Sequence, residues 1–124
     1  MAIETECESG IAAFGDADLL EETLAALLDN AVANTDQGAI RITTTEQEWR
    51  AWIEVADTGR GILPEHRARV FEPFYRPWHG EGFGLGLAIA RQAVEAMDGR
   101  IEIDRSEAGG TTVRVQLPSA RVVA

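Results

Sequence analysis

The acidic residue best placed to do chemistry is Asp57, which ends an alternating apolar run and opens the sequence Asp57-Thr-Gly-Arg-Gly-Ile62. Asp57 shares strand parity with Ile53 and Val55, so its carboxylate is expected to point with their side chains into the protein layer. A buried carboxylate needs a hydrogen-bond donor, because burying it unpaired costs several kcal/mol. The two glycines of this sequence allow backbone to approach a ligand closely. The pattern predicts either a ligand site or an ordinary strand-end turn.

A second candidate is Gly82-Phe-Gly-Leu-Gly-Leu87, in which three glycines alternate just ahead of an expected helix. Free backbone N–H groups and the positive end of a helix form an anion site that suits phosphate. The spacing matches neither the dinucleotide fingerprint nor the P-loop, and no strand leads directly into it. The pattern alone leaves open a phosphate site or a simple glycine-rich turn.

Asn30 is the third candidate, on a helix expected to begin near residue 18. On a helical wheel it lies about 100° from the centre of the leucine stripe, on a flank that it shares with Thr23, Ala26 and Asn34. Small and amide residues beside an apolar stripe suit the floor of a ligand site. An amide oxygen also suits Mg²⁺, which uses few protein ligands and keeps several waters. The alternative is a helix-flank Asn without a role.

The elements expected in the first part of the chain are short strands and one long helix. Ile3, Thr5 and Cys7 alternate with glutamates, which predicts a half-exposed strand over residues 3–7. Residues 11–14 predict a second short strand. Asp18 followed by Glu21 has capping-box spacing, with Asp18 at the cap. The apolar stripe of the helix then has a period of 3.6, at Leu20, Leu24, Leu27, Leu28 and Ala31.

The rest of the chain predicts two strands near 39–46 and 49–57, a brief helix from Pro64 to about Val70, and a loop over 72–83. A largely buried helix follows at 85–97, and a closing hairpin turns at 106–110. The order predicts an α+β fold for residues 1–124 as a single domain. We expect a two-layer α/β sandwich, in which three helices pack on one face of a mixed sheet of about five strands.

Composition limits the classes of partner. The chain has 124 residues and a net charge of -10, which argues against binding to nucleic acid or to an anionic membrane. All 11 basic residues are Arg, so any side-chain cation that holds phosphate must be Arg. Cys7 is the only cysteine, which excludes an internal disulfide. No apolar run approaches the roughly 20 residues of a membrane helix, and the acidic start does not resemble a signal peptide. We expect a cytoplasmic location.

Four segments together resemble named boxes of sensor histidine kinases, in the same order and with compatible spacing over about residues 3–117. The segments that resemble the asparagine, first glycine, phenylalanine and second glycine boxes are Leu27-Leu-Asp-Asn-Ala31, Asp57-Thr-Gly-Arg-Gly-Ile62, Phe71-Glu-Pro-Phe-Tyr-Arg76 and Gly82-Phe-Gly-Leu-Gly-Leu-Ala-Ile89. These kinases belong to a superfamily with gyrase, heat-shock chaperone and mismatch-repair ATPases. The resemblance therefore implies the Bergerat-type ATP-binding fold.

The resemblance also implies a site for ATP and Mg²⁺. Asn30 would coordinate Mg²⁺ at the phosphates, Asp57 would accept the adenine amino group, and Arg76 would supply the phosphate cation. Asn30 and Arg76 are thus the implied catalytic residues. Residues 71–82 would form a mobile lid whose root is anchored in the core by Phe71 and Phe74. The implied nucleotide-binding residues are Asn30, Asn34, Asp57, Gly59, Gly61, Ile62, Phe74, Tyr75, Arg76, Gly82, Phe83, Gly84, Leu85, Gly86, Leu87 and Thr111.

Three positions depart from the family's pattern. The family commonly has Asn four residues before the Mg²⁺ ligand, where this chain has Ala26. It commonly has Lys and then an aromatic residue after the ligand, where this chain has Ala33 and Asn34. We therefore expect weaker nucleotide binding than in a typical member, or compensation by Arg60, Arg76 or Trp78. Ala26 also argues against a gyrase-type or chaperone-type ATPase, because those enzymes place a Glu general base at this position.

The implied function is that of the catalytic domain of a sensor histidine kinase. It would donate the ATP γ-phosphate to a histidine on a separate dimerisation domain, which in turn serves a response regulator. Neither His66 nor His79 lies in a phosphoacceptor-like helix, and both are expected at the solvated surface. A degenerate nucleotide-binding module that regulates partners is the alternative. The resemblance leaves open whether the parent kinase is anchored in the inner membrane.

Overall fold

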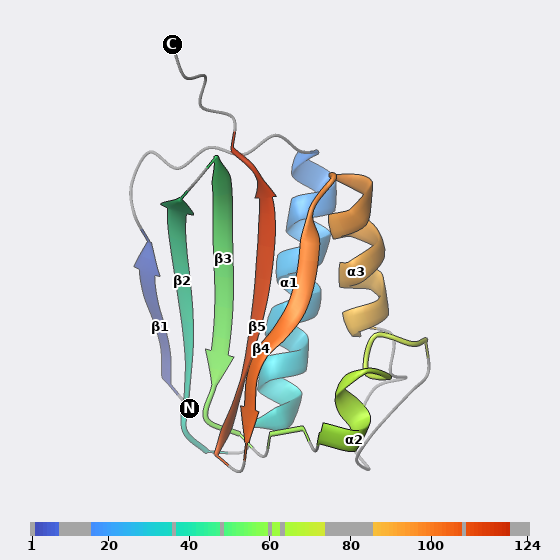
Figure 1. The fold of residues 1–124 in the computed structure, drawn as a ribbon. Helices are drawn as coiled ribbons and strands as arrows, with labels where there is room; N and C mark the ends of the chain where they lie inside the picture. Colours follow the sequence, from blue (N-terminus) through green and yellow to red (C-terminus); the bar gives the residue numbers. More distant parts are fainter. Residues whose placement is uncertain are drawn as a thin grey trace.

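The computed structural model describes residues 2–7, 16–35, 37–47, 49–59, 61–62, 64–73, 86–107 and 109–119. Figure 1 shows that the strands form one layer, and that two long helices lie side by side against one face of this layer. The predicted α/β sandwich, with a mixed five-stranded sheet and three helices over the described residues, is confirmed. The elements are β1 (Ala2–Cys7), α1 (Ala17–Asn34), β2 (Ala39–Gln47), β3 (Arg50–Asp57), α2 (Pro64–Arg67), α3 (Gly86–Ala96), β4 (Arg100–Glu107) and β5 (Gly110–Pro118).

The strand order of the sheet is β1-β2-β3-β5-β4. β1 runs parallel to β2, and the three other pairs are antiparallel, which makes the sheet mixed. β3 is therefore central, and its last residue, Asp57, has a paired neighbour on each side, Ile40 on β2 and Thr111 on β5. The second strand predicted at residues 11–14 lies outside the described residues.

The two faces of the sheet follow the alternation in its sequence. On β5 every odd-numbered residue from Thr111 to Leu117 is buried, and the even-numbered residues between them are only partly covered. On β3 the buried residues Ala51, Val55 and Asp57 share the same parity. The covered face packs against apolar residues of the helices to form one core cluster. Asp57 thus lies on the core side of the sheet, as its parity with Val55 predicts.

The cap of α1 is Asp16, so the prediction of Asp18 as the cap residue is wrong. Asp16 has an extended backbone (φ -98°, ψ 127°), and its Oδ1 accepts hydrogen bonds from the N–H groups of Asp18 at 2.8 Å and Leu19 at 3.2 Å. A cap residue needs this non-helical backbone, whereas Asp18 already lies inside the helix. The sequence has a carboxylate at both positions, and the local backbone selects Asp16.

The most buried face of α1 is rotated from the predicted leucine stripe towards its small and polar flank. Leu20, Leu24 and Leu28 are only partly buried, whereas the buried residues of the helix are Thr23, Ala26, Leu27, Ala31 and Asn34. α3 packs along this flank, and it brings small buried residues of its own, Ala90 and Ala93. Small side chains on both helices let the backbones approach closely, so the flank becomes the contact between the helices and the leucines turn partly outward.

The remaining boundaries differ from the predictions by a few residues, as expected at element ends. α2 stops at Arg67, and the chain continues in turns through Pro73, where a helix was predicted to about Val70. α3 buries only one face, since Arg91 and Glu95 lie with Ile89 and Gln92 on an exposed one. Within the described residues, none of the helices has both the length and the apolar character needed to span a membrane.

Candidate functional site

The centre of the candidate site is the carboxylate of Asp57. Only 7% of this residue is exposed, at the end of the central strand. Burial was predicted to require a donor, and the protein itself provides two, because the backbone N–H groups of Gly59 and Thr111 both donate to the carboxylate. The Gly59 hydrogen bond measures 2.9 Å at Oδ1. A carboxylate has about four lone-pair sites, so it retains acceptor capacity for a further donor.

Burial raises the pKa of the Asp57 carboxyl above its ordinary value, and the two backbone hydrogen bonds only partly offset this effect. The dominant cause is desolvation, because low-dielectric surroundings disfavour the charged form. A donor placed beside the carboxylate would favour that charged form. The site is thus prepared for a hydrogen-bond donor, whether neutral or cationic.

The turn after Asp57 is fixed on both sides. The Thr58 N–H donates to the Ala39 carbonyl at 3.1 Å, and the Thr58 Oγ1 accepts from the Ala39 N–H at 3.0 Å. These bonds continue the β2–β3 pairing one residue past Asp57. Beyond them, Gly61 has a left-handed backbone (φ 74°) and is buried beside Ile62, which is 2% exposed. The end of the first glycine box, Gly61 and Ile62, therefore lies in the core, whereas Thr58 is exposed.

Gly59 is required by its contact with the end of α1. A Cβ added at Gly59 would overlap the carbonyl oxygen of Asn34, and it would lie 2.9 Å from Thr35 Oγ1. Real Cβ atoms essentially never approach backbone so closely, which leaves only glycine at this position. The turn that donates to Asp57 thus touches the helix that carries both asparagines.

The asparagines of α1 lie one turn apart and differ in burial. Asn30 is partly exposed, whereas Asn34 is 2% exposed and belongs to the buried face of the helix. Neither side-chain polar atom of Asn34 has a hydrogen-bond partner anywhere in the described part of the chain, and the neighbouring Thr35 Oγ1 has none there either. Each buried polar group left unpaired costs about 1–3 kcal/mol. Asn34 and Thr35 together carry three such atoms within the described residues, next to the turn that follows Asp57.

The start of α3 lies against α1. A Cβ built on Gly86, the first residue of α3, would make an ordinary 3.6 Å contact with the carbonyl oxygen of Ala26, one turn before Asn30. Leu87 follows directly and is buried in the core. The end of the second glycine box therefore contacts α1 just before the asparagine box.

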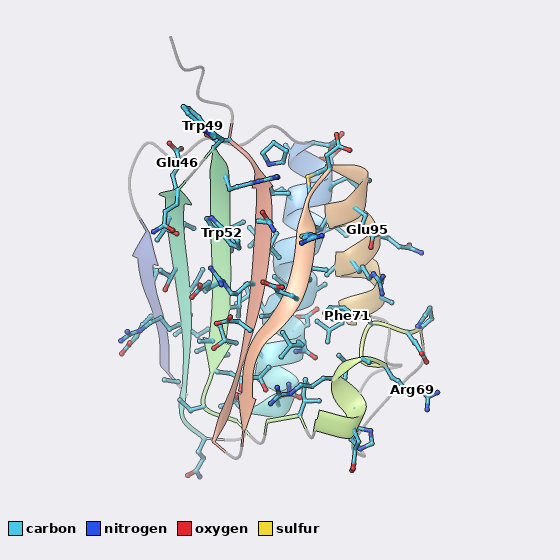
Figure 2. All side chains as sticks on the ribbon, in the orientation of Figure 1. Glu46, Trp49, Trp52, Arg69, Phe71 and Glu95 are labelled. Carbon is cyan, nitrogen blue, oxygen red and sulfur yellow. The ribbon has the colours of Figure 1, made fainter. Side chains whose placement is uncertain are left out.

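The root of the proposed lid also lies at this layer. Phe71 packs against the core cluster, and the guanidinium carbon of Arg91 lies 5.9 Å from its ring centroid. Figure 2 shows Phe71 between the segment after α2 and the lower end of α3. The other predicted site residues of this region lie outside the described residues: Phe74, Tyr75, Arg76, Gly82, Phe83, Gly84 and Leu85, together with Arg60, Trp78 and His79.

The structure adds two residues that sequence reasoning did not select. Thr35 caps the end of α1 and places its hydroxyl beside Gly59. A Cβ on Gly110 would overlap the carbonyl oxygen of Asp57, so the first residue of β5 must also be small. The doubled glycine before Thr111 was visible in the sequence, but the β3–β5 register that places it against Asp57 was not.

Comparison with known proteins gives this geometry a family. The profile of the family described as "Histidine kinase-, DNA gyrase B-, and HSP90-like ATPase" matches residues 15–121. The sensor protein KdpD of Mycobacterium tuberculosis is 38% identical over 108 residues, which cover 85% of this chain and 13% of KdpD. The chain thus spans a small part of the length of this relative.

Two solved structures extend the likeness to the whole fold. Full-length ShkA in complex with AMPPNP superposes with a TM-score of 0.83 at 31% identity, covering 98% of this chain and 27% of ShkA. The mycobacterial sensor histidine kinase MprB gives a TM-score of 0.80 at 29% identity, covering 97% of this chain and 84% of that structure. The chain therefore belongs to the histidine kinase-, DNA gyrase B- and HSP90-like ATPase family, and it is homologous to the catalytic domains of sensor histidine kinases.

Proposed function

We propose that this chain is a single domain that binds ATP with Mg²⁺ and donates the γ-phosphate to a histidine on a separate dimerisation domain. That domain would then serve a response regulator, and the reaction would take place in the cytoplasm. The observation that carries the proposal is the buried Asp57 carboxylate at the end of the central strand, held by the N–H groups of Gly59 and Thr111. Its remaining acceptor capacity fits the amino group of adenine.

At the base end of the site, Asp57 accepts from adenine while Thr111, Gly59 and Gly61 shape the surroundings. Gly59 brings backbone close to the end of α1, Gly61 has a left-handed backbone, and Ile62 is buried next to it. The complex of ShkA with AMPPNP, an ATP analogue, favours a nucleotide in the same fold. Asn34 would lie at this end too, because its carbonyl packs on Gly59.

At the phosphate end, Asn30 would hold Mg²⁺ through its amide oxygen, which fits a hard cation that uses few protein ligands. Its partly exposed side chain lies on the same helix as Asn34, and the α3 start at Gly86 lies one turn away, against Ala26. Mg²⁺ would neutralise charge on the phosphates. The remaining phosphate contacts are proposed for Leu87 and for Tyr75, Arg76 and the glycine-rich stretch 82–85, with Phe74 and Phe83 packing around them.

Ala26 favours the kinase over a hydrolase. A gyrase-type or chaperone-type ATPase would place a Glu general base at this position, and a methyl group that is 8% exposed cannot take a proton from water. Without that base, the acceptor must be a nucleophile brought by a partner. In the proposed transfer the bond from the γ-phosphorus to its bridging oxygen breaks, an N–P bond forms on imidazole, and ADP leaves. For such a step the protein mainly has to position the reacting groups and neutralise the charge on the phosphates.

The phosphoacceptor is proposed to lie outside this chain. His66 lies in α2, where its Nε2 is 3.8 Å from Glu65 Oε1. α2 has only four residues, too few for the phosphoacceptor helix of a dimerisation domain. His79 lies in the stretch proposed as the lid. The partner therefore has to bring the acceptor imidazole.

The test is a reconstituted transfer. The chain is mixed with the histidine-bearing domain of its own kinase, Mg²⁺ and ATP labelled at the γ-phosphate. We expect acid-labile label on that domain, and loss of the label with Asn30→Ala, which keeps the fold but removes the metal ligand. Free labelled phosphate without labelled protein would indicate an ATPase instead. Tight ATP binding with neither product would indicate the degenerate regulatory module.

A further inference from the structure

The carboxamide of Asn34 is buried on α1. The residue is 2% exposed, and both its Oδ1 and its Nδ2 lack a hydrogen-bond partner among the described residues. An apolar side chain of similar size would fill the same position on the buried face of α1 without this penalty. A buried polar group in this state needs a partner, and a bound ligand can supply one.

Asn34 lies next to the turn that holds the Asp57 carboxylate. The contact between its carbonyl and Gly59 is so close that a Cβ does not fit, and the Gly59 N–H donates to Asp57 at 2.9 Å. The side chain of a helical residue leans towards the preceding turn, which here carries Asn30 and Ala31. Asn34 therefore lies beside the turn that follows Asp57 and one helical turn after Asn30. The unpartnered hydroxyl of Thr35 adds a second polar group at the same place.

The chemistry of an amide differs from that of Asp57 in a useful way. An ionised carboxylate can only accept, whereas a carboxamide offers an acceptor and a donor side by side. A 6-aminopurine offers the complementary pair, an amino donor next to a ring-nitrogen acceptor, and Asn pairs with adenine edges through two parallel hydrogen bonds in other settings. An aromatic residue, which the resemblance predicts here, would offer only a stacking face.

We infer that Asn34 is a base-reading residue, whose carboxamide hydrogen-bonds to the polar edge of a 6-aminopurine beside Asp57, directly or through one ordered water. The inference rests on the proposed function and adds to it the group that sets base selectivity. Removing such a group leaves the substrate's polar atoms unpaired, so discrimination is lost together with affinity. The unpaired amide lowers the stability of the ligand-free protein, and this cost accompanies the gain in base selectivity.

The experiment compares the parent with Asn34→Leu in two measurements. The first is thermal unfolding without nucleotide, where Asn34→Leu is expected to raise the midpoint by a few degrees because it removes an unpaired buried amide. The second is calorimetric titration with ATP and with the triphosphate of purine riboside, which carries hydrogen in place of the 6-amino group. We expect Asn34→Leu to bind ATP about tenfold more weakly, and its preference for ATP over the analogue to shrink several-fold.

The matched control is Val32→Thr, which keeps the size of the side chain and changes its polarity. Val32 lies two residues earlier on the exposed side of α1 and is 47% exposed. It should leave both affinities unchanged. Asn34→Ala is the second variant, and the same two titrations on it test the inference if leucine does not fit at this position. Unchanged ATP affinity in a folded Asn34 variant overturns the inference, and so does an equal loss for both ligands. A folded parent that binds neither ligand overturns the proposed function itself, which is a distinct result.

Discussion

Asp57 and Thr111 lie directly opposite each other on β3 and β5, and the backbone N–H of Thr111 donates to the Asp57 carboxylate. The pairing joins two segments that are far apart in sequence at the centre of the sheet. Gly110 and Gly59 then bring backbone against Asp57 and Asn34 from both sides. The carboxylate is therefore held by strand register at Thr111 and by the packed turn at Gly59, which is the arrangement expected of a preorganised acceptor.

Asp57→Asn is the first test of that acceptor. The amide keeps an oxygen for the Gly59 N–H, but its other polar atom becomes a donor that faces the base amino group. Hydrogen bonds to charged groups contribute about 1.5–3 kcal/mol, so we expect ATP affinity to fall on the order of thirtyfold. Calorimetric titration measures the change. Glu102→Gln, the same chemical change at an exposed position of β4, is the control and should bind like the parent.

The raised pKa of Asp57 predicts a pH dependence of stability. Because the folded pKa lies above the ordinary value of 3.8, the contribution of Asp57 to stability is fully present below pH 3.8 and is lost as pH rises through the raised value. The free energy of unfolding of Asp57→Asn should therefore increase relative to the parent across this window, by about 1.4 kcal/mol per unit of upward pKa shift.

Urea unfolding of both proteins at a series of pH values from about 3 to 7 measures this difference. Taking the difference between parent and variant cancels the titration of the other carboxyl groups, which the two chains share. A constant difference over the whole range would mean that the pKa of Asp57 is not raised in the folded protein. A difference that changes in the opposite direction would mean that its two backbone hydrogen bonds outweigh burial.

The sequence predicted much of the fold because its strands and glycines are locally determined. Alternation placed Asp57 on the covered face, and the structure has it there. The element order followed from turn residues and apolar periods, with end shifts of a few residues. The asparagine and glycine boxes were found by resemblance, and residues Asn30 and Asp57 lie on elements that touch through Gly59.

What the sequence could not predict depends on contacts between elements. The rotation of α1 towards Thr23 and Ala26 results from packing against α3, which a single-helix wheel does not contain. The burial of Asn34 follows from that rotation and from the close approach of Gly59. Likewise, one donor to Asp57 depends on the β3–β5 register and the other on the turn at Gly59, so strand alternation could indicate only that donors were needed.

The contacts of Arg114 on β5 predict a measurable energetic coupling between this residue and its neighbours on the uncovered face of the sheet. Its guanidinium lies 4.3 Å from the ring centroid of Trp52, its Nε lies 2.9 Å from Glu54, and its Nη1 lies 3.4 Å from Asp104. Figure 2 shows Trp52 on β3. Since the arginine is partly exposed, solvent screens these contacts, and we expect Arg114→Met to cost about 1–2 kcal/mol.

A double-mutant cycle with Trp52→Leu separates the ring contact from the ion pairs. We expect about 0.5–1 kcal/mol of coupling between Arg114 and Trp52, measured by urea unfolding. High salt should reduce the cost of Arg114→Met, because it screens only the carboxylate contacts. Additive single effects would show that the guanidinium and the ring lie close without interacting.

Gly59→Ala tests the contact on which the site geometry depends. The new methyl group would meet the backbone carbonyl of Asn34 and the hydroxyl of Thr35, and a backbone group at the end of a packed helix cannot move aside freely. We expect a loss of about 2–3 kcal/mol in the free energy of unfolding. We also expect weaker ATP binding, because a displaced turn takes the Gly59 N–H away from Asp57. Gly86→Ala is the stability control, since its added Cβ makes only a 3.6 Å contact and should change stability by less than about 0.5 kcal/mol. If both variants unfold at the same urea concentration, the end of α1 and the turn after Asp57 are not in rigid contact, and the link between Asn34 and the carboxylate is lost with it.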